Sequence, residues 1–387
     1  MPIKVEDYYA PATFQRMKAF ADTQETPFVV IDTAIISQAY DDLRAGFEFA
    51  KVYYAVKANP AVEIIDLLKE KGSSFDIASI YELDKVMGRG VSPDRISYGN
   101  TIKKSKDIRY FYEKGVRLFA TDSEADLRNI AKAAPGAKVY VRILTEGSTT
   151  ADWPLSRKFG CQTDMAMDLL ILARDLGLVP YGISFHVGSQ QRDISVWDAA
   201  IAKVKVIFER LKEEDGIELK MINMGGGFPA NYITRTNSLE TYAEEIIRFL
   251  KEDFGDDLPE IILEPGRSLI ANAGILVSEV VLVARKSRTA VERWVYVDVG
   301  MFSGLIETMG EAIKFPLYTE KKGEMEEVVI AGPTCDSADI MYENYKYGLP
   351  LNLAIGDRVY WLSTGAYTTS YSAVEFNGFP PLKSFYL

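Results

Sequence analysis

Histidine and cysteine are scarce in this chain of 387 residues. It has one histidine, His186, and two cysteines, Cys161 and Cys335. One histidine excludes zinc sites of the HExxH type and clusters of several histidine ligands, so we expect no metal. Two cysteines are too few for a disulfide framework and fit a reducing compartment, so we expect a cytoplasmic protein.

Long apolar runs and runs of basic residues are also missing. The first residues lack the apolar core of a signal peptide, and no uncharged stretch suits a membrane span. Acidic residues outnumber basic ones by 55 to 44, and the formal net charge is -11. Because a nucleic-acid partner usually requires a basic patch, we expect neither nucleic acid nor a membrane as partner.

The first two thirds of the chain repeat one pattern. A short β-branched or aromatic run ends in polar or glycine-rich residues, and an amphipathic stretch follows. Eight such runs end at Asn59, Ser79, Asn100, Asp122, Leu144, Ser189, Gly227 and Arg267. This number of strand-helix units predicts a (β/α)8 barrel, whose parallel strands each need a crossover. An open doubly wound sheet is the alternative, but no G-x-G-x-x-G turn follows an early strand.

After Arg267 the strands follow one another without long helices between them, as in ILVSEVVLVARK and DRVYWLS. This pattern predicts an antiparallel β-domain. We expect the barrel at residues 27–270 and the β-domain at residues 271–387, with residues 1–26 packed against it. The segment FVVIDT, residues 28–33, is expected to bridge the two domains.

The C-terminal ends of barrel strands form the active site, so the last residues of each run are candidates. Lys57 follows the apolar VYYAV, where partial desolvation would lower the pKa of its amine and favour a nucleophile. A lysine that simply reaches solvent is the plainer alternative. Gly225 to Gly227 end the seventh run and Arg267 follows the eighth, and together they suit a phosphate.

Three more residues at strand ends add to this set. Glu264 can keep the ring nitrogen of a pyridine cofactor protonated. His186 is either a core residue or a flat face for a bound ring, and Ser189 offers a hydroxyl to phosphate. A nucleophilic lysine, a phosphate cradle, a carboxylate and a stacking imidazole together predict a site for pyridoxal 5'-phosphate.

Nine motifs occur in the order of one known family: YYAVKAN, FDIAS, KFG, HVGSQ, GGG, EPGR, GPTCDS, GAYT and FNGF. On these the chain resembles the alanine-racemase-like, fold-type III pyridoxal phosphate enzymes. Within them it is most similar to the ornithine, diaminopimelate and arginine decarboxylases, above all the ornithine branch. The resemblance implies that Lys57 carries the cofactor and that Glu82 is a second carboxylate beside Asp76. The cofactor contacts that it implies are Lys57, Asp76, Arg142, His186, Ser189, Gly225, Gly226, Gly227, Glu264, Gly266, Arg267 and Tyr367.

The resemblance also implies the substrate side of the site. Cys335 would reprotonate the product and Asp336 would bind a distal ammonium, with Tyr367 and Phe376 as further substrate contacts. The catalytic residues would be Lys57, His186, Glu264 and Cys335. The expected protein is a homodimer with shared active sites.

The reaction implied is decarboxylation of L-ornithine to putrescine and CO2 in polyamine biosynthesis. Lysine, or both substrates, is the first alternative, because one methylene is worth only about 1 to 3 kcal/mol in a pocket. Diaminopimelate is the second, since its extra carboxylate would need a further cationic group.

In one place the chain departs from the eukaryotic ornithine decarboxylases, which carry a Tyr-Asp pair upstream of the cysteine motif. Residues 304–320 contain no such pair. Glu307, Glu311 and Tyr318 are the candidates for a second contact to the distal amine. An alanine racemase and a non-catalytic regulatory homologue remain as other classes; the GPTCDS motif argues against the first, and the intact set of site residues against the second.

Overall fold

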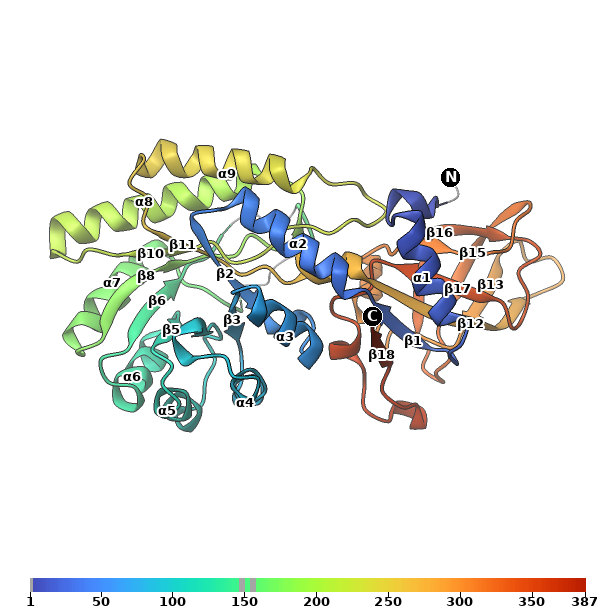
Figure 1. The fold of residues 1–387 in the computed structure, drawn as a ribbon, viewed down its shortest axis with the longest axis horizontal. Coiled ribbons are helices and arrows are strands. Elements are labelled where there is room, and N and C mark those ends of the chain that lie inside the picture. The colour runs from blue at the N-terminus through green and yellow to red at the C-terminus, as the bar shows by residue number, and fades with distance from the viewer. Residues whose placement is uncertain (1–2, 146–149, 154–157) are drawn as a thin grey trace. The chain divides into compact units, whose positions relative to one another are not determined.

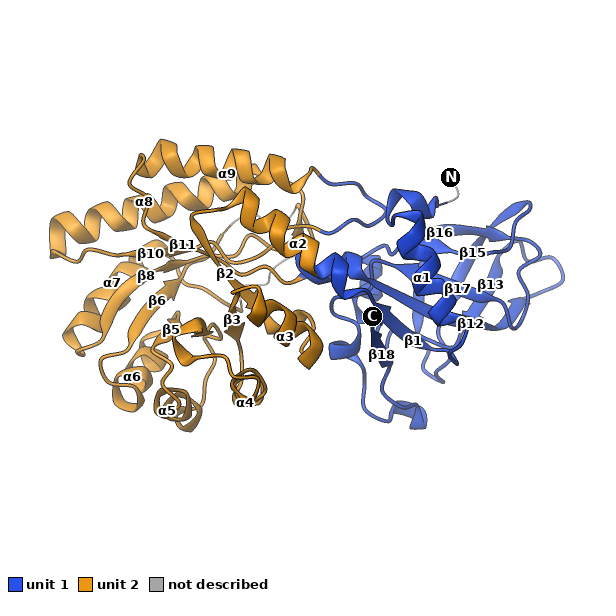
Figure 2. Ribbon diagram, viewed as in Figure 1, with its two compact units in different colours: residues 1–36, 230–236, 267–387 blue, residues 37–229, 237–266 orange. Residues whose placement is uncertain are grey.

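The computed structural model describes residues 3–145, 150–153 and 158–387. Residues 1 and 2 of the predicted N-terminal segment lie outside this description. The chain forms two compact units, shown in Figure 2. One contains residues 37–229 and 237–266, and the other contains the residues up to 36 together with 230–236 and 267–387.

The first unit is a closed parallel barrel of eight strands, which confirms the predicted (β/α)8 architecture (Figure 1). In order around the barrel the strands are β10 (Met221–Asn223), β11 (Glu260–Leu263), β2 (Ala50–Ala55), β3 (Ser74–Ile77), β4 (Ile96–Tyr98), β5 (Leu118–Thr121), β6 (Lys138–Arg142) and β8 (Val179–Ser184). Each overlaps one of the predicted runs. The barrel core includes Tyr53, Leu118, Ala120, Tyr140, Met221 and Ile262.

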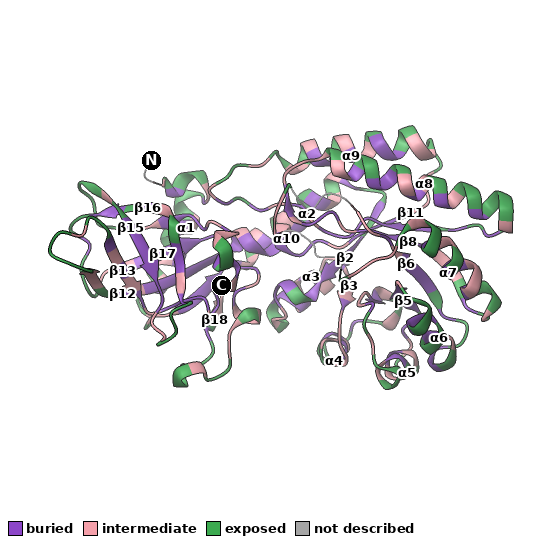
Figure 3. Cartoon of the chain, turned by 180° about the vertical axis from the view of Figure 1, so that it is seen from behind, coloured by how far each residue is buried: buried purple, intermediate pink, exposed green. Residues whose placement is uncertain are grey.

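Amphipathic helices connect the strands. They are α2 (Thr33–Gly46), α3 (Val62–Glu70), α4 (Ile80–Gly88), α5 (Ser105–Glu113), α6 (Glu124–Ala133), α7 (Thr163–Asp175), α8 (Ser195–Asp215) and α9 (Leu239–Phe254). Figure 3 shows buried stripes on α8 and α9 beside exposed faces, as the sequence periodicity predicts. The helices pack their apolar stripes toward the barrel. The polar residues of the predicted runs lie at the ends of the strands.

The second unit is a sheet of eight strands built around β12 (Gly274–Arg285). The others are β1 (Phe28–Ile31), β13 (Arg293–Val297), β14 (Leu317–Tyr318), β15 (Met325–Ala331), β16 (Ile340–Pro350), β17 (Arg358–Leu362) and β18 (Lys383–Tyr386). Most pairs are antiparallel, as predicted, but β13 with β15 and β1 with β18 are parallel.

Strand β1 corrects the expected position of FVVIDT as a bridge. All four residues of β1 are buried, and the strand pairs with β12 on one side and β18 on the other. Because both edges are hydrogen-bonded, β1 is an internal strand of the second unit, and the boundary falls near residue 36 instead of 27. Phe14 and Met17 of helix α1 (Pro11–Ala21) are buried in the same apolar cluster as Phe28.

In the described part of the chain, no helix combines the length and the apolar character that crossing a membrane requires.

Candidate active site

Lys57 lies in η2 (Val56–Ala58), a single 3-10 turn directly after β2. The backbone N–H of Ala55 donates to the Pro265 carbonyl at 3.0 Å, which ties the end of β2 to the loop after β11. Val56 and Ala58 are buried, whereas the Lys57 side chain is exposed. The lysine therefore stands at the C-terminal end of the strand with its side chain exposed.

Asp76 lies in β3 and is the most perturbed carboxylate of the barrel. Burial raises its pKa well above the ordinary value, and the charge of Glu264 raises it further, while Lys57 and Arg142 act in the opposite direction. Its buried Oδ1 has no hydrogen-bond partner among the described residues. A side chain at Gly99, the residue after β4, would overlap this carboxylate and force it to move.

Glu82 occupies the start of α4. Its Oε2 accepts the Ala78 N–H at 2.7 Å, and its own N–H donates to the Ser79 hydroxyl at 3.3 Å. The Ser79 hydroxyl thus caps α4, and Glu82 binds the N–H one residue before the cap, in a variant of the capping box that stabilises the helix start. Burial raises the pKa of Glu82, and the charge of Lys57 lowers it.

Glu264 follows β11 and is held by Asn223, a residue that the sequence analysis missed. The Asn223 amide donates to Glu264 Oε1, and its Oδ1 accepts the Gly225 N–H at 2.9 Å. Burial raises the pKa of Glu264, while the Asn223 hydrogen bond and the charges of Lys57 and Arg142 lower it. The sequence did contain an indication of Asn223. It is an asparagine inside the apolar run MINM, where a buried amide without a partner would cost free energy.

His186 and the glycine loop lie together. The Gly188 N–H donates to His186 Nδ1 at 3.0 Å, which leaves the ring proton on Nε2. Burial lowers the His186 pKa well below its ordinary value, and the charges of Arg142 and Lys57 lower it further. The imidazole is therefore neutral near pH 7, with its plane fixed by one hydrogen bond.

The loop Gly225 to Gly227 requires glycine at each position. A side chain would lie 2.5 Å from a backbone oxygen at Gly225 and at Gly226, and 2.6 Å from one at Gly227. Two of the three have positive φ, 63° at Gly225 and 100° at Gly227. Because every Cβ would clash with neighbouring backbone, only a loop of three glycines can pass so close to His186.

Arg142 and Ser189 complete the barrel set. Arg142 ends β6, and its guanidinium lies 5.0 Å from the centre of the Phe159 ring of the KFG motif. Burial lowers the pKa of Arg142, and the nearby charge of Glu264 raises it. Ser189 begins β9 (Ser189–Gln191), which pairs with β7 (Ala151–Trp153).

Arg267 belongs to the second unit and is buried with Glu307. Its two terminal nitrogens bind the two Glu307 oxygens at 2.7 and 2.6 Å, and both side chains are 3% exposed. The Tyr232 hydroxyl accepts a further bond at 3.0 Å, and the Tyr367 ring lies 4.8 Å from the guanidinium carbon. Arg267 thus lies beside Tyr367 and forms an ion pair with Glu307 that the sequence analysis did not predict.

The cysteine motif lies in a loop before β16. Cys335 and Asp336 are exposed, and the Cys335 N–H donates to the side chain of Asn377 at 2.9 Å. Asp339, which is buried, accepts the Met301 N–H at 2.8 Å and both donors of Thr334. Asp339 was not predicted. Its hydrogen bonds anchor the loop, while the two predicted substrate residues stay exposed.

The remaining predicted contacts have other partners. Phe376 packs on Phe302 with ring centres 4.8 Å apart. Glu311 accepts three backbone N–H groups of β16 at 2.6 to 2.9 Å, and Tyr318 packs edge-on against Phe14. With Glu307 bound to Arg267, all three candidates for a second contact to the distal amine have structural partners.

The barrel residues fit a pyridoxal phosphate. Asp76 supplies a buried acceptor that the described residues leave unsatisfied, and Glu264 a carboxylate fixed by an amide. Beside them lie a neutral imidazole, an exposed lysine and a loop that only glycine can form. Carboxylates suit the protonated ring of the cofactor, and an imidazole suits its flat face. A lysine suits its aldehyde, and a glycine loop suits its phosphate.

Comparison with known proteins gives the family. Residues 33–271, more than half of the chain, match the model "Pyridoxal-dependent decarboxylase, pyridoxal binding domain". The chain is 34% identical to a lysine/ornithine decarboxylase of Selenomonas ruminantium, over 94% of this chain and 90% of that one. It is 32% identical to the ornithine decarboxylase of Saccharomyces cerevisiae, over 92% and 79%.

A solved structure agrees. The lysine/ornithine decarboxylase of Vibrio vulnificus, complexed with cadaverine, is similar with a TM-score of 0.88 and 28% identity, over 98% of this chain and 99% of that one. The cofactor predicted from the sequence is the one that this family uses. The protein therefore belongs to the family of pyridoxal phosphate-dependent decarboxylases.

Proposed function

We propose that the protein decarboxylates L-ornithine to putrescine and CO2 in polyamine biosynthesis, with L-lysine as a second substrate. The observation that carries the proposal is the exposed carboxylate of Asp336 beside the thiol of Cys335, on a loop anchored by Asp339. A carboxylate suits a substrate whose side chain ends in a cation. The decarboxylases of ornithine and lysine among the relatives support the same class.

When bound, pyridoxal phosphate supplies the electron sink for the electrons of the broken bond to the carboxylate. Lys57 would carry it, and Gly225 to Gly227 with Arg267 would hold its phosphate. Glu264, fixed by Asn223, would accept a hydrogen bond from the ring nitrogen, and its negative charge would favour the protonated ring. His186 would present a neutral face, because its Nδ1 already accepts the Gly188 N–H.

The β-unit would supply the proton and the recognition of the substrate. The Cys335 thiol is exposed and would give its proton to the substrate carbon. Asp336 accepts the Ala338 N–H at 2.9 Å through Oδ1, which orients the carboxylate. It would bind the distal ammonium.

We also propose a cytoplasmic homodimer in which Cys335 and Asp336 act in the partner's barrel. The exposure of Cys335 and Asp336 on a loop supports this proposal, since it leaves both side chains accessible to a partner subunit. Two inactive variants, Lys57→Ala and Cys335→Ala, test this when mixed. Shared sites predict recovery of about a quarter of wild-type activity, because half of randomly paired dimers hold one intact site. No recovery despite subunit exchange would contradict shared sites.

The proposed reaction is tested by CO2 release from ornithine, lysine, diaminopimelate and arginine, with kcat/KM compared side by side. A preference for ornithine of about 10-fold or more supports the proposal, since one methylene is worth about 1 to 3 kcal/mol. Comparable rates for lysine would make the enzyme dual-specific. No CO2 from any of the four would overturn the proposed function.

A further inference from the structure

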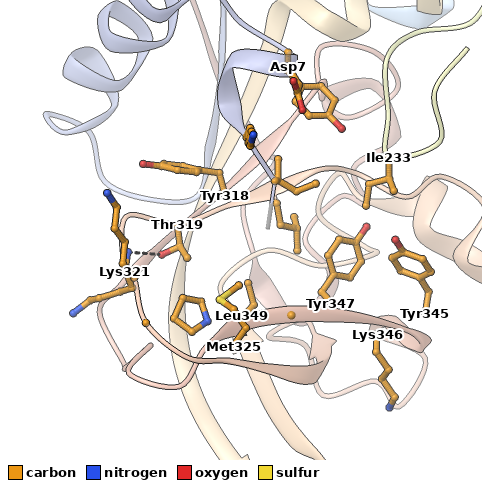
Figure 4. Close-up of a pocket in the computed structure, with 18 of the residues that line it drawn as sticks. Asp7, Ile233, Tyr318, Thr319, Lys321, Met325, Tyr345, Lys346, Tyr347 and Leu349 are labelled. Atoms are coloured by element: carbon orange, nitrogen blue, oxygen red, sulfur yellow. Dashed lines mark hydrogen bonds between the residues drawn. The ribbon is translucent and has the colours of Figure 1, made fainter. Parts of the chain in front are cut away.

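The second unit contains a cavity that, of the site candidates named above, only Tyr318 lines. Its volume is about 870 Å³, within the usual size of small-molecule sites. The wall is built from residues 3, 4, 7 and 8, residues 233 and 235, residues 317–319, 321–323 and 325, and residues 345–350 of β16 (Figure 4). These segments are far apart in sequence, so the cavity is a product of the fold.

Positive charge dominates the wall. One carboxylate, Asp7, faces five cationic side chains, although acidic residues predominate in the whole chain. The five are Lys4, Arg235, Lys321, Lys322 and Lys346. Within the described residues, Lys4 and Lys322 form no ion pair, whereas the other three do. The cavity therefore attracts anions and repels diamines such as the proposed substrate and product.

Aromatic rings line the same cavity. Four tyrosines contribute, and Figure 4 shows Tyr345 and Tyr347 next to each other with Tyr318 across from them. The Tyr345 and Tyr347 ring centres are 5.0 Å apart in an edge-to-face arrangement. The Tyr347 hydroxyl donates to the Phe315 carbonyl at 2.7 Å, and the Tyr345 N–H is bound by Glu311. The hydroxyl bond thus fixes the buried Tyr347 ring, and the partly exposed Tyr345 ring packs against it.

We propose that this cavity binds a nucleotide, with the base against the tyrosine rings and the phosphates beside Lys4 and Lys322. Tyrosine faces stack on any base, and ammonium groups bind phosphate oxygens as point charges. Neither feature by itself selects a nucleotide. Their combination selects a ligand that has both a flat ring and several negative charges. This proposal does not depend on the reaction proposed above.

The test is isothermal titration of the full-length holoenzyme with ATP at about 0.15 M salt, where long-range attraction between exposed charges is screened. Saturation with pyridoxal phosphate beforehand keeps ATP out of the cofactor's phosphate site. We expect saturable binding with a Kd below about 1 mM. Adenosine and inorganic triphosphate should each bind at least about 10-fold more weakly, because each lacks half of the recognition.

Two variants locate the site. The double variant Lys4→Glu/Lys322→Glu reverses two exposed charges without breaking an ion pair of the described residues, and should weaken ATP binding about 10-fold or more. Tyr345→Ala should weaken both ATP and adenosine. The matched control Lys212→Glu reverses a lysine of α8 that is 67% exposed and should leave the Kd unchanged.

Three results would overturn the proposal. They are absence of saturable ATP binding, an unchanged Kd in the Lys4/Lys322 double variant, and triphosphate binding as tight as ATP. The double variant keeps the test decisive if Tyr345→Ala unfolds, since both of its positions are exposed.

Discussion

The barrel and the β-unit prepare their functional residues in different ways. In the barrel, Asp76 lies in β3, Glu264 and His186 follow β11 and β8, and burial shifts the pKa of each. In the β-unit, Cys335 and Asp336 are exposed on a loop, and their fixed geometry comes from the buried Asp339. Burial shifts proton affinities in the barrel, whereas the β-unit presents two exposed groups at a defined place.

This contrast separates two roles. A cofactor that the barrel retains through many turnovers can be held by buried and desolvated groups. A substrate that must enter and leave is better bound by exposed side chains. Variants in the barrel should therefore affect the cofactor's own signals, and variants of the loop should affect mainly the substrate constants.

The largest effect is expected for Lys57→Ala. Loss of the only nucleophilic amine at the end of β2 should lower kcat by about 10⁴-fold or more and remove the visible absorbance of the bound cofactor. Lys51→Ala is the matched control, since Lys51 lies on the same strand and its side chain is 59% exposed. Near-normal turnover in Lys57→Ala would refute the role of Lys57.

The next effect concerns the ion pair that the β-unit buries. Glu307→Ala would leave the Arg267 guanidinium buried without its partner, at a cost of about 3 to 5 kcal/mol in the free energy of unfolding. Urea unfolding measures it. Glu320→Ala, which removes an exposed partner of Lys18, should cost less than about 1 kcal/mol. A loss in Glu307→Ala no larger than in this control would show that the buried pair is not needed for stability.

Replacing Arg267 and Glu307 together sharpens this point. The double variant Arg267→Met/Glu307→Leu should regain most of the lost stability, because apolar side chains of similar volume replace buried ion pairs well. It should not regain affinity for pyridoxal phosphate, which fluorescence titration measures directly. Recovery of both would exclude Arg267 as a phosphate ligand.

A smaller effect is expected for Asp336→Asn. Removal of one charge of the proposed ammonium contact should lower kcat/KM for ornithine by about 10²-fold, mainly through KM, and leave the cofactor absorbance unchanged. Asp256→Asn is the control, since Asp256 is 98% exposed on the barrel. If Asp336→Asn lost cofactor absorbance to the same degree as kcat/KM, the loop would support the cofactor as well. The contrast between the two units would then be wrong.

The smallest effect is expected at Glu311. Burial acts to raise its pKa, but three backbone N–H donors of β16 outweigh burial, and the net pKa is lowered. A lowered pKa in the folded state gives stability above the unfolded value of about 4.3, and this stability is lost as pH falls through the folded pKa. Glu311→Gln should therefore cost about 1 kcal/mol at pH 7 and less near pH 3.5, measured by urea unfolding. A cost that does not change with pH would argue against this charge effect.

Much of the fold could be predicted because it is local. Each barrel strand is a short apolar run with polar residues at its end, and each helix has its own apolar stripe. The strand ends then follow from the topology, which is why Lys57, His186 and Glu264 could be named as candidates. The loop of three glycines was visible for the same reason.

The parts that sequence reasoning missed depend on distant partners. Nothing near Glu307 indicates that Arg267 binds it, and nothing near Asp339 indicates that Met301 donates to it. Strand β16 was missed because its polar and aromatic residues follow no clear alternation. FVVIDT was misplaced because its neighbours in the sheet, β12 and β18, lie in the last third of the chain.

The pairing of β1 has a consequence for synthesis on the ribosome. Thr33, just after β1, donates its hydroxyl to the carbonyl of Leu387, 354 residues later in the chain. At about 5 to 20 residues per second, roughly 20 to 70 s pass between the translation of these two residues. Until β12 is made, the apolar strand FVVI has neither partner, and until β18 is made it lacks the second, while the barrel that follows β1 can already close. The nascent chain therefore carries FVVI as an unpaired, aggregation-prone strand. Binding of a chaperone to this strand would prevent aggregation.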